Sequence, residues 1–353
     1  MTDDASKRLA MAEFDYELPP ELIAQTPLAD RSASRLLHLD RTSGQMTDRA
    51  FTEIVELLNP NDLLVLNDSR VIPARLLGHR PTGGRAEALL LRKRSDGDWL
   101  ALMRPARRLA PGERVEIHGR EPGLKPESFE IVERLEEGQA VVRLSEGLER
   151  HLPKYGRVPL PPYIHEVLDE DERYQTLYSR TSGSAAAPTA GLHFTDEVFD
   201  TLAAKSVRRA FVTLHVGLDT FRPVTAEYAE DHLIHQEWCE VPAETVAAIR
   251  ETRRRGGRVV AVGTTSARTL ESFGEAVDDL AVNSWSSMTG IYITPGFQWQ
   301  VVDAMVTNFH LPKSTLLLMM SSFAGKDALF EAYRHAIAER YRFFSFGDAM
   351  FIS

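Results

Sequence analysis

The sequence predicts an α/β protein: a large α/β domain with a mixed sheet, interrupted by an inserted small antiparallel β-barrel domain. Two observations predict this class. At both ends of the chain, apolar runs typical of buried strands alternate with stretches of helical spacing. Between them, short strand-like runs follow one another without a convincing helix. We therefore expect a discontinuous catalytic domain at residues 1–70 and 151–353, with the β domain at residues 71–150.

The first part of the chain supplies the opening elements of the α/β domain. Residues 14–27 place a Pro-Glu pair before apolar residues, which favours a short helix. Residues 35–39 are typical of a strand, and residues 51–58 have apolar side chains at helical spacing. Residues 63–66 predict a buried strand that ends in the polar cluster Asn67-Asp68-Ser69-Arg70. Such a cluster at a strand end is what a binding site at the edge of a sheet requires.

The insertion combines regular strand spacing with a local excess of positive charge. Glycine-containing turns separate five strand-like runs, at residues 86–91, 99–103, 114–117, 128–132 and 140–144. Nine arginines and lysines lie between Val71 and Arg108, against three acidic residues. A solvated surface explains such a cluster most simply, but it also suits a face that binds nucleic acid.

The chain after the insertion returns to alternating strands and helices. Thr195 can cap a helix, and a proline followed by hydroxyl residues at 312–315 can stop a strand and start another helix before the apolar run 316–323. Predicted helices cover residues 169–179, 196–204, 241–255, 265–273 and 327–339. Predicted strands cover residues 207–214, 258–262, 288–294 and 301–306.

Composition limits the functional classes. The chain has 353 residues, 43% of them apolar, which is ordinary for a globular protein. No apolar run is long enough for a membrane span, and the polar N-terminus lacks a signal core, so we expect a cytoplasmic protein with no membrane partner. One cysteine, Cys239, argues against a disulfide framework and against a cysteine-based metal site. The net charge of −10 disfavours wholesale nonspecific binding of nucleic acid. We expect a monomer.

The strongest candidate site is the segment 301–316, where a predicted strand breaks into Thr307-Asn308-Phe309-His310. Packing hydrogen-bonding side chains into a turn between two buried elements is typical of a site at the end of a sheet. A second candidate is Gly263-Thr264-Thr265-Ser266, where a strand ends and a helix begins with free N–H groups that suit an anion. A capped strand-to-helix turn with one satisfied histidine explains the first segment equally well, and an ordinary capped helix start is the preferred explanation of the second segment when it is taken alone.

Histidines and carboxylates recur in several predicted turns. His232 and His235 share the segment 231–237 with Asp231 and Glu237, and their spacing would place both rings on one face of a helix. A third strong metal ligand at a familiar spacing is missing, so acid–base chemistry or substrate hydrogen bonding explains this segment better than a metal. The pairs His215 with Asp219 and Asp303 with His310 offer the same chemistry. Sequence signatures of dinucleotide loops, phosphate loops, metalloproteases and serine hydrolases are absent.

Segments from one end of the chain to the other resemble the S-adenosylmethionine:tRNA ribosyltransferase-isomerase family of queuosine biosynthesis. Residues 183–195 and 307–315 are the most specific matches. The others are residues 14–19, 67–76, 215–221, 263–268 and 341–350. Ile234, Gln236 and residues 289–292 depart from the family pattern, which puts local contacts in doubt.

The resemblance implies an unusual reaction. The family transfers the ribosyl portion of S-adenosylmethionine to a 7-aminomethyl-7-deazaguanine base at the wobble position of tRNA. Rearrangement then gives epoxyqueuosine, with release of adenine and methionine. S-adenosylmethionine is the cosubstrate, and no metal or further cofactor is implied. A conventional RNA methyltransferase and a non-enzymatic RNA-binding factor are the alternatives; the first lacks its usual glycine-rich loop here, and the second would be expected to show a dominant basic face.

The family resemblance does not assign roles to single residues, so three groups are hypotheses. Proton handling is assigned to His215, Asp231, Glu237, Asp303 and His310. Binding of the cosubstrate is assigned to Thr189, Gly191, Thr264, Thr265, Ser266 and Arg268. Contacts with RNA are assigned to Asp68, Arg70, Arg75, Arg92, Lys93, Arg94, Arg107 and Arg108. Phe309 can either stack on a base or pack the core.

Overall fold

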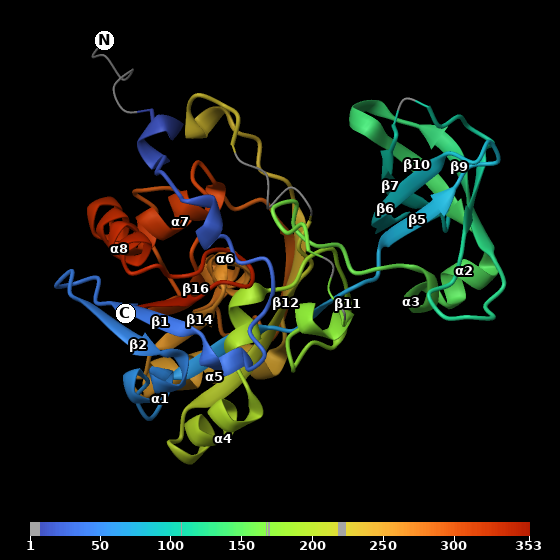
Figure 1. Cartoon of the computed structure of the whole chain (residues 1–353). Coiled ribbons are helices and arrows are strands. Elements are labelled where there is room, and N and C mark those ends of the chain that lie inside the picture. The colour runs from blue at the N-terminus through green and yellow to red at the C-terminus, as the bar shows by residue number, and fades with distance from the viewer. Residues whose placement is uncertain (1–7, 107, 167, 169, 218–223) are drawn as a thin grey trace, which may run out of the picture. The chain divides into compact units, whose positions relative to one another are not determined.

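The computed structural model describes residues 8–106, 108–166, 168, 170–217 and 224–353. The chain divides into two compact units (Figure 1). The larger unit comprises Met1–Arg70 and Pro161–Ser353, and the smaller unit comprises Val71–Leu160. The larger unit contains a mixed sheet with helices, and the smaller unit contains a closed antiparallel barrel, so the predicted α/β class with a β-barrel is confirmed.

The larger unit is built on a nine-stranded mixed sheet, with strand order β15-β13-β12-β3-β14-β16-β17-β1-β2 among the described residues. The strands are β1 Arg35–Leu39, β2 Met46–Ala50, β3 Leu63–Asn67, β12 Arg208–Leu214, β13 Glu237–Val241, β14 Val259–Val262, β15 Trp285–Thr289, β16 Ala304–Asn308 and β17 Ala349–Ile352. A separate two-stranded sheet pairs β4 Ser69–Val71 with β11 Thr181–Ser184.

The centre of the large sheet has the strand order that creates a binding crevice. Strands β12, β3, β14 and β16 are neighbours and run parallel. Strand β3 comes first in the chain, yet it lies between β12 and β14, so the order of strands switches on either side of it. In open α/β sheets ligands bind beyond the carboxyl ends of the strands at such a switch. The carboxyl ends of these four strands therefore mark the edge at which a site is expected.

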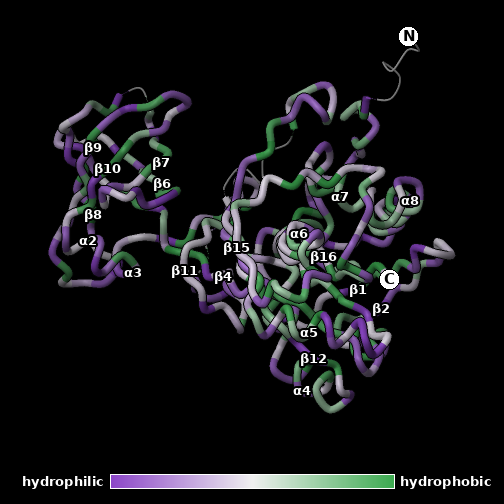
Figure 2. The backbone as a smooth tube through the Cα atoms, turned by 180° about the vertical axis from the view of Figure 1, so that it is seen from behind, coloured by the Kyte–Doolittle hydropathy of each residue, from purple (hydrophilic) through white to green (hydrophobic). Residues whose placement is uncertain are grey.

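Helices cover both faces of the sheet because its central strands are apolar on both sides. Along β3, Leu63 and Val65 join one core, whereas Leu64 and Leu66 join the other. The first core also contains residues of α5 Ala243–Arg254, α6 Thr264–Phe273, α7 Thr315–Ala324 and α8 Lys326–Ala338. The second contains residues of α1 Ile54–Leu57 and α4 Asp196–Ala204. Figure 2 shows hydrophobic segments gathered in the central strands.

Short 3₁₀ helices connect many of these elements. They span Met11–Phe14, Pro20–Leu22, Arg31–Ala33, Phe51–Glu53, Asp171–Tyr174, Thr189–His193, Ala229–Asp231 and Gly274–Ala276 in the larger unit. In the part of the chain that the structure describes, no helix is long and apolar enough to cross a membrane.

The smaller unit is a closed six-stranded antiparallel barrel with strand order β10-β7-β6-β5-β8-β9. Its strands are β5 Arg75–His79, β6 Arg85–Lys93, β7 Trp99–Arg104, β8 Arg114–Ile117, β9 Glu127–Arg134 and β10 Gln139–Leu144. Helices α2 Glu146–Arg150 and α3 Leu152–Tyr155 follow the last strand. The barrel has its own core, which contains Leu76, Leu90 and Phe129. Backbone hydrogen bonds of 3.0 Å and 2.9 Å between Arg75 and Arg157 join its first and last segments.

Several predicted elements differ from the structure. The predicted helix 169–179 is reduced to the 3₁₀ helix Asp171–Tyr174, and Tyr174, Gln175 and Thr176 are buried. The predicted strand 288–294 is displaced, since β15 ends at Thr289. Strands β2, β5, β13 and β17 were not predicted.

Candidate active site at the carboxyl edge of the sheet

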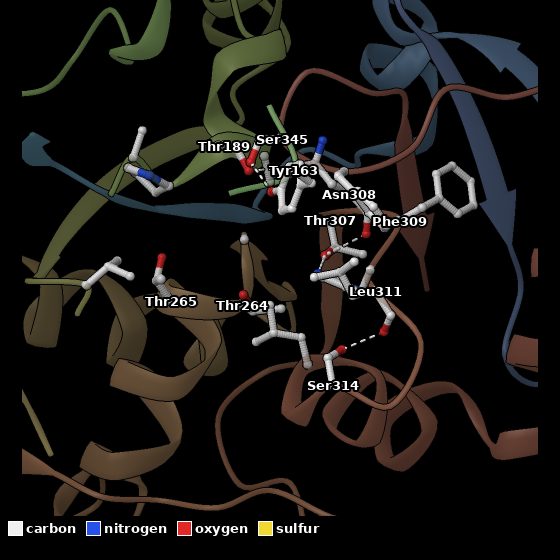
Figure 3. Close-up of a pocket in the computed structure, with 18 residues that line it drawn as sticks. Tyr163, Thr189, Thr264, Thr265, Thr307, Asn308, Phe309, Leu311, Ser314 and Ser345 are labelled. Atoms are coloured by element: carbon white, nitrogen blue, oxygen red, sulfur yellow. Dashed lines mark hydrogen bonds between the residues drawn. The ribbon is translucent and has the colours of Figure 1, made fainter. Parts of the chain in front are cut away.

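A cavity lies in the larger unit, where the parallel strands end. Three segments provide most of its wall: residues 187–190, residues 263–265 after β14, and residues 307–311 at the end of β16 (Figure 3). The remaining lining residues are Tyr163, Val216, Ser314, Leu316, Phe344 and Ser345. The predicted active-site segment at the end of β16 therefore does line a cavity at the edge that the strand order indicates.

Asn67 ties three of the elements around this edge together. It is the last residue of β3 and fully buried. Its side-chain amide donates to the carbonyl of Leu214 and to the hydroxyl of Thr265, both over 3.1 Å, and its Oδ1 accepts from the N–H of Leu214 over 3.1 Å. The ends of β3 and β12 and the start of α6 are thus fixed by one side chain.

Helix α6 begins at the cavity with hydroxyl side chains. Gly263 precedes it with φ of +86°, a backbone conformation that favours glycine. Thr264 and Thr265 line the cavity at the first turn, where helical N–H groups lack intrahelical partners. The hydroxyl of Ser266 instead donates to the carbonyl of Val262 over 2.8 Å and is buried. The first turn can therefore bind an anion, while Ser266 serves the helix itself.

Asn308 presents an amide to the cavity in a fixed orientation. Its Oδ1 accepts from the hydroxyl of Thr189 over 3.3 Å, and its Nδ2 lies 3.1 Å from Nε2 of His193. The other nitrogen of that ring, Nδ1, lies 2.7 Å from the hydroxyl of Ser34. Burial lowers the pKa of His193 to about 3, so the ring is neutral. A neutral ring that accepts from Asn308 must carry its proton on Nδ1, facing Ser34.

His310 also lines the cavity, and its surroundings hold it in place. Its Nε2 is 3.2 Å from the hydroxyl of Thr307, and its backbone N–H donates to the hydroxyl of Tyr333 over 2.9 Å. The Tyr16 hydroxyl donates to the His310 carbonyl. Burial lowers the pKa of His310 to about 3, which makes the ring a weak base. This geometry suits a side chain that positions the turn better than one that accepts a proton.

An aromatic wall and a hydroxyl pair complete the cavity. The rings of Tyr163 and Phe344 are 4.8 Å apart, and the Tyr163 hydroxyl lies 2.7 Å from the hydroxyl of Ser345. Phe309, by contrast, is fully buried among core aromatic rings, 4.8 Å from that of Phe343. Figure 3 shows its side chain directed away from the other labelled residues. Phe309 therefore packs the core, and the aromatic faces at the cavity belong to Tyr163 and Phe344.

His215 lies beside the cavity, next to the lining residue Val216. Its ring stacks on Trp238 at 5.3 Å, and a Cβ atom added to Gly183 would lie 2.8 Å from it. The buried Nδ1 has no hydrogen-bond partner among the described residues. Burial lowers the pKa of His215, which keeps the ring neutral at neutral pH. Its proposed partner Asp219 lies outside the described residues.

Glu237 and Arg268 form a buried ion pair near His215. Both side chains are less than a tenth exposed, and the Arg268 guanidinium donates to Oε2 of Glu237. Oε1 of Glu237 accepts the backbone N–H of Gly217 over 2.7 Å. Nε and Nη2 of Arg268 have no hydrogen-bond partner within the described part of the chain. A buried guanidinium with spare donors can still bind an anionic group of a ligand.

Three of the predicted site residues lie away from the cavity. Asp303 precedes β16, at the opposite edge of the sheet, and its carboxylate accepts the N–H of Val259 over 2.8 Å. Asp231 is exposed and pairs with Arg8. Gly191 packs against Tyr178, whose hydroxyl would meet an added Cβ at 1.9 Å. The segment of His232 and His235 is not helical, so the predicted shared helical face is wrong.

The residues predicted to contact RNA fall into two groups. In the larger unit, Asp68 is buried and pairs with Arg180, whereas Arg70 is partly exposed and pairs with Glu172. In the barrel, Arg75 pairs with Glu87 and lines an open hollow of about 1320 Å³ together with Arg85 and Arg104. Of the other barrel residues predicted to contact RNA, Arg92, Lys93, Arg94 and Arg108 are exposed, and Lys93 pairs with Glu149 and Arg94 with Asp96. Arg107 lies outside the described residues.

Sequence reasoning missed three polar residues of the site. His193 and Ser345 lie in segments whose sequence was singled out, but nothing local indicated that they face Asn308 and Tyr163. Tyr163 follows Pro161 and Pro162, and no local pattern there indicates a site. In the described ranges, no group of three histidine, cysteine, aspartate or glutamate side chains is arranged to hold a metal ion.

Comparison with known proteins is consistent with this arrangement. A family model described as queuosine biosynthesis protein matches residues 11–352. The crystal structure of the S-adenosylmethionine tRNA ribosyltransferase from Thermotoga maritima is 41% identical in sequence, with a TM-score of 0.56. The match covers 97% of this chain and 100% of that one.

Proposed function

The chain belongs to the queuosine biosynthesis protein family, and we propose from this membership that it is an S-adenosylmethionine:tRNA ribosyltransferase-isomerase. It transfers the ribosyl portion of S-adenosylmethionine to the 7-aminomethyl-7-deazaguanine base at the tRNA wobble position, and adenine and methionine leave. The observation that carries the proposal is the cavity at the switch point of the sheet, lined by family-specific segments 187–190, 263–265 and 307–311. The expected resemblance to this family is confirmed.

The cavity offers complementary groups for S-adenosylmethionine. The first turn of α6, with Thr264 and Thr265, suits the carboxylate of the methionine portion. Arg268, with two unused donors, is the second group proposed for this charge. The aromatic faces of Tyr163 and Phe344 suit the sulfonium, because a cation is attracted to the face of an aromatic ring. Thr189 and Asn308 supply hydrogen bonds along the same wall.

The reaction needs a base for the acidified proton beside the sulfonium, and His215 is the group we propose. Its ring is neutral, and its Nδ1 has no hydrogen-bond partner among the described residues. This nitrogen is therefore available for proton transfer. Glu237 accepts from Gly217, two residues after His215, and so steadies this segment. His310 has partners on its ring and backbone, and we assign it a positioning role.

Departure of adenine requires hydrogen-bond donors that do not need to change charge. Thr307, Asn308 and Ser345 line the cavity as neutral hydroxyl and amide groups. The Tyr163 hydroxyl stays protonated, since burial raises its pKa. These groups can stabilise the leaving base without an acid of matched pKa.

The barrel is proposed to bind the tRNA. Its exposed residues Arg92, Lys93, Arg94 and Arg108, with Arg85 and Arg104 at the hollow, form a local basic surface on an acidic protein. In the larger unit, Arg70 is proposed to contact the RNA. Electrostatic contacts of this kind position the nucleic acid, while a flipped base enters the catalytic cavity. We also propose a monomer that acts in the cytoplasm, where its two substrates are available.

One experiment tests the proposed reaction. Purified protein is incubated with S-adenosylmethionine and tRNA that carries the deazaguanine precursor, and the small products are separated. Adenine and methionine in equal amounts are expected. Adenosylhomocysteine would indicate a methyltransferase, and tRNA binding without turnover would indicate an RNA-binding factor; either result would overturn the proposal.

A further inference from the structure

A second, small cavity in the larger unit adjoins the first, and the reaction described above does not use it. Its lining includes Arg31, Ser34, Arg173, His193, Ser345 and Gly347. Arg31 comes from the 3₁₀ helix Arg31–Ala33 and Arg173 from the 3₁₀ helix Asp171–Tyr174. Two segments far apart in the sequence therefore bring two guanidinium groups to one small cavity.

The wall between the two cavities is thin. Asn308 lines the first cavity and His193 lines the second, and their side chains are 3.1 Å apart. Ser345 lines both cavities. A ligand with two neighbouring groups can thus place one group in each cavity.

Among the described residues, two arginines and no acidic residue line the second cavity. Burial and the charge of Arg173 lower the pKa of Arg31, and the charge of Glu172 offsets part of this effect. Arg31 uses two N–H groups for the carbonyls of Gln175 and Glu172, at 2.7 Å and 2.9 Å, and Arg173 donates to the carbonyl of Leu28. The side chain of Glu172, the neighbouring acid, is paired with Arg70.

A third cation acts on the same wall. Besides burial, the charges of Arg342 and Arg31 lower the pKa of His193, so both arginines lie near its ring. Nη1 of Arg342 is buried without a hydrogen-bond partner among the residues described. The carboxylate of Asp348 is engaged by the backbone N–H groups of Arg35 and Arg342. Arg31 and Arg342 act on the neutral ring of His193, and Arg173 lines the same cavity, while Glu172 and Asp348 offset part of this positive charge. A bound anion would stabilise the remaining charge.

We propose that the second cavity holds a backbone phosphate of the tRNA, next to the nucleotide whose base enters the first cavity. This inference rests on the proposed function. Guanidinium groups match the oxygens of phosphate in geometry and charge, and RNA carries a phosphate on either side of every base. The carboxylate of S-adenosylmethionine already has the start of α6 and Arg268 available. Changes to the arginines of the second cavity should therefore weaken RNA binding and leave binding of S-adenosylmethionine unchanged.

The test uses the full-length wild-type protein and anticodon stem-loops with a neutral methylphosphonate at one position. Replacing the phosphate on one side of the wobble nucleotide is expected to weaken binding about tenfold, the effect of losing one hydrogen bond to a charged group. The same replacement at other positions of the loop is the control. Equal weakening at every position, or none at the wobble nucleotide, would overturn the proposal.

Variants then connect that phosphate to the cavity. The variants Arg31→Gln and Arg173→Gln should each bind the unmodified stem-loop about tenfold more weakly than the wild type. Their affinity should no longer change when the methylphosphonate replaces the phosphate beside the wobble nucleotide. The salt dependence of their RNA affinity should fall by about 0.7 per lost contact in the slope of log K against log salt. Arg334→Gln is the matched control, since Arg334 is 73% exposed on α8 and pairs with Glu331.

The outcomes separate the two proposals. If the variants lose affinity for S-adenosylmethionine but keep affinity for RNA, the cavity holds the cosubstrate's anion and the phosphate assignment is wrong. If the wild-type protein releases no adenine, the proposed reaction fails, while the binding comparison still decides the phosphate assignment. Should either variant unfold, as judged by its melting curve, the methylphosphonate result with the wild-type protein remains decisive.

Discussion

His193 and His310 are two residues whose environment fixes their charge. Both are almost completely buried in the larger unit, and burial lowers the pKa of each to about 3. His193 accepts from Asn308 and His310 contacts Thr307, so neutral rings are needed for the hydrogen bonds that shape the cavity. Protonation of either ring would place an unpaired charge in the interior.

This arrangement predicts a loss of stability in mild acid. The unfolded chain binds protons at these histidines near pH 6.5, whereas the folded protein resists protonation down to about pH 3. Their contribution is therefore complete above pH 6.5 and is lost as the pH falls from 6.5 towards 3. At pH 5 each ring should cost about 2 kcal/mol of unfolding free energy. Urea unfolding of the wild type and His193→Gln at pH 7 and pH 5 measures this.

His193 and His310 together lower the free energy of unfolding between pH 7 and pH 5. The His193→Gln variant should lose about half of this decrease. Glutamine can still accept from Asn308, so the comparison isolates the titration. An identical pH dependence in the variant and the wild type would contradict the prediction.

His215 and His310 predict different kinetic effects. His215→Ala should lower kcat for adenine release by 100-fold or more, the effect typical of losing a general base (about 10²–10⁴). His310→Ala should mainly raise KM and lower the melting temperature, because it disturbs the turn. Because the pKa of His215 is lowered, the decrease of kcat/KM with falling pH should begin below pH 6.5. Near-normal kcat in His215→Ala would remove this residue from the chemistry.

At the scale of secondary-structure elements, the cavity depends on where strands stop. Asn67 holds the ends of β3 and β12 against the start of α6. Asn67→Ala should therefore destabilise the larger unit by about 2–4 kcal/mol, because it leaves the buried groups of Leu214 without partners. Asn59→Ala is the control, since Asn59 is exposed. Urea unfolding measures both, and equal midpoints would contradict the assigned role.

Gly183 of β11 predicts a steric effect on His215. A Cβ at residue 183 would meet the imidazole ring at 2.8 Å, and φ is +145° there. Gly183→Ala should therefore displace His215 and lower kcat at least tenfold, as misplaced catalytic groups do. Gly296→Ala adds comparable backbone strain, at φ of +100°, but nothing lies within 4 Å of its Cβ. Equal activity in the two variants would show that the ring does not depend on this contact.

Elements with a strong local pattern were predictable from the sequence. Strands β1 and β8 have the predicted bounds, and α4, α6 and α8 agree to within a residue at each end. Strands whose position depends on pairing with other strands were not predictable from the sequence. Strand β17 is set by its pairing with β16 and β1, and β13 by its pairing with β12 and β15, which no local pattern reveals.

The candidate site was predictable to the same extent. The turn after β16 and the start of α6 were visible because polar residues follow an apolar run. The partners of these segments were not visible, because His193 and Tyr163 reach the cavity through tertiary packing. Asp303 shows the opposite error: it is adjacent to the right strand in sequence but lies at its amino end, beyond reach of the cavity.

At the scale of the whole molecule, the barrel and the larger unit have separate cores. Replacing residues 71–160 with a short flexible linker should leave the larger unit folded and able to bind S-adenosylmethionine. Affinity for the tRNA should fall by at least tenfold and lose much of its salt dependence. Calorimetric titrations with each substrate measure this. Unchanged RNA affinity would contradict the role proposed for the barrel.

The paired backbones of Arg75 and Arg157 have a consequence for the history of the chain. The first and last segments of the barrel are neighbours. Its coding sequence can therefore be gained, lost or exchanged as one unit without altering the register of any strand in the large sheet. Under the RNA-binding role proposed for the barrel, selection can then change which RNA is bound by changing the barrel alone. The catalytic edge, built from strand ends elsewhere in the sequence, is inherited independently of that change.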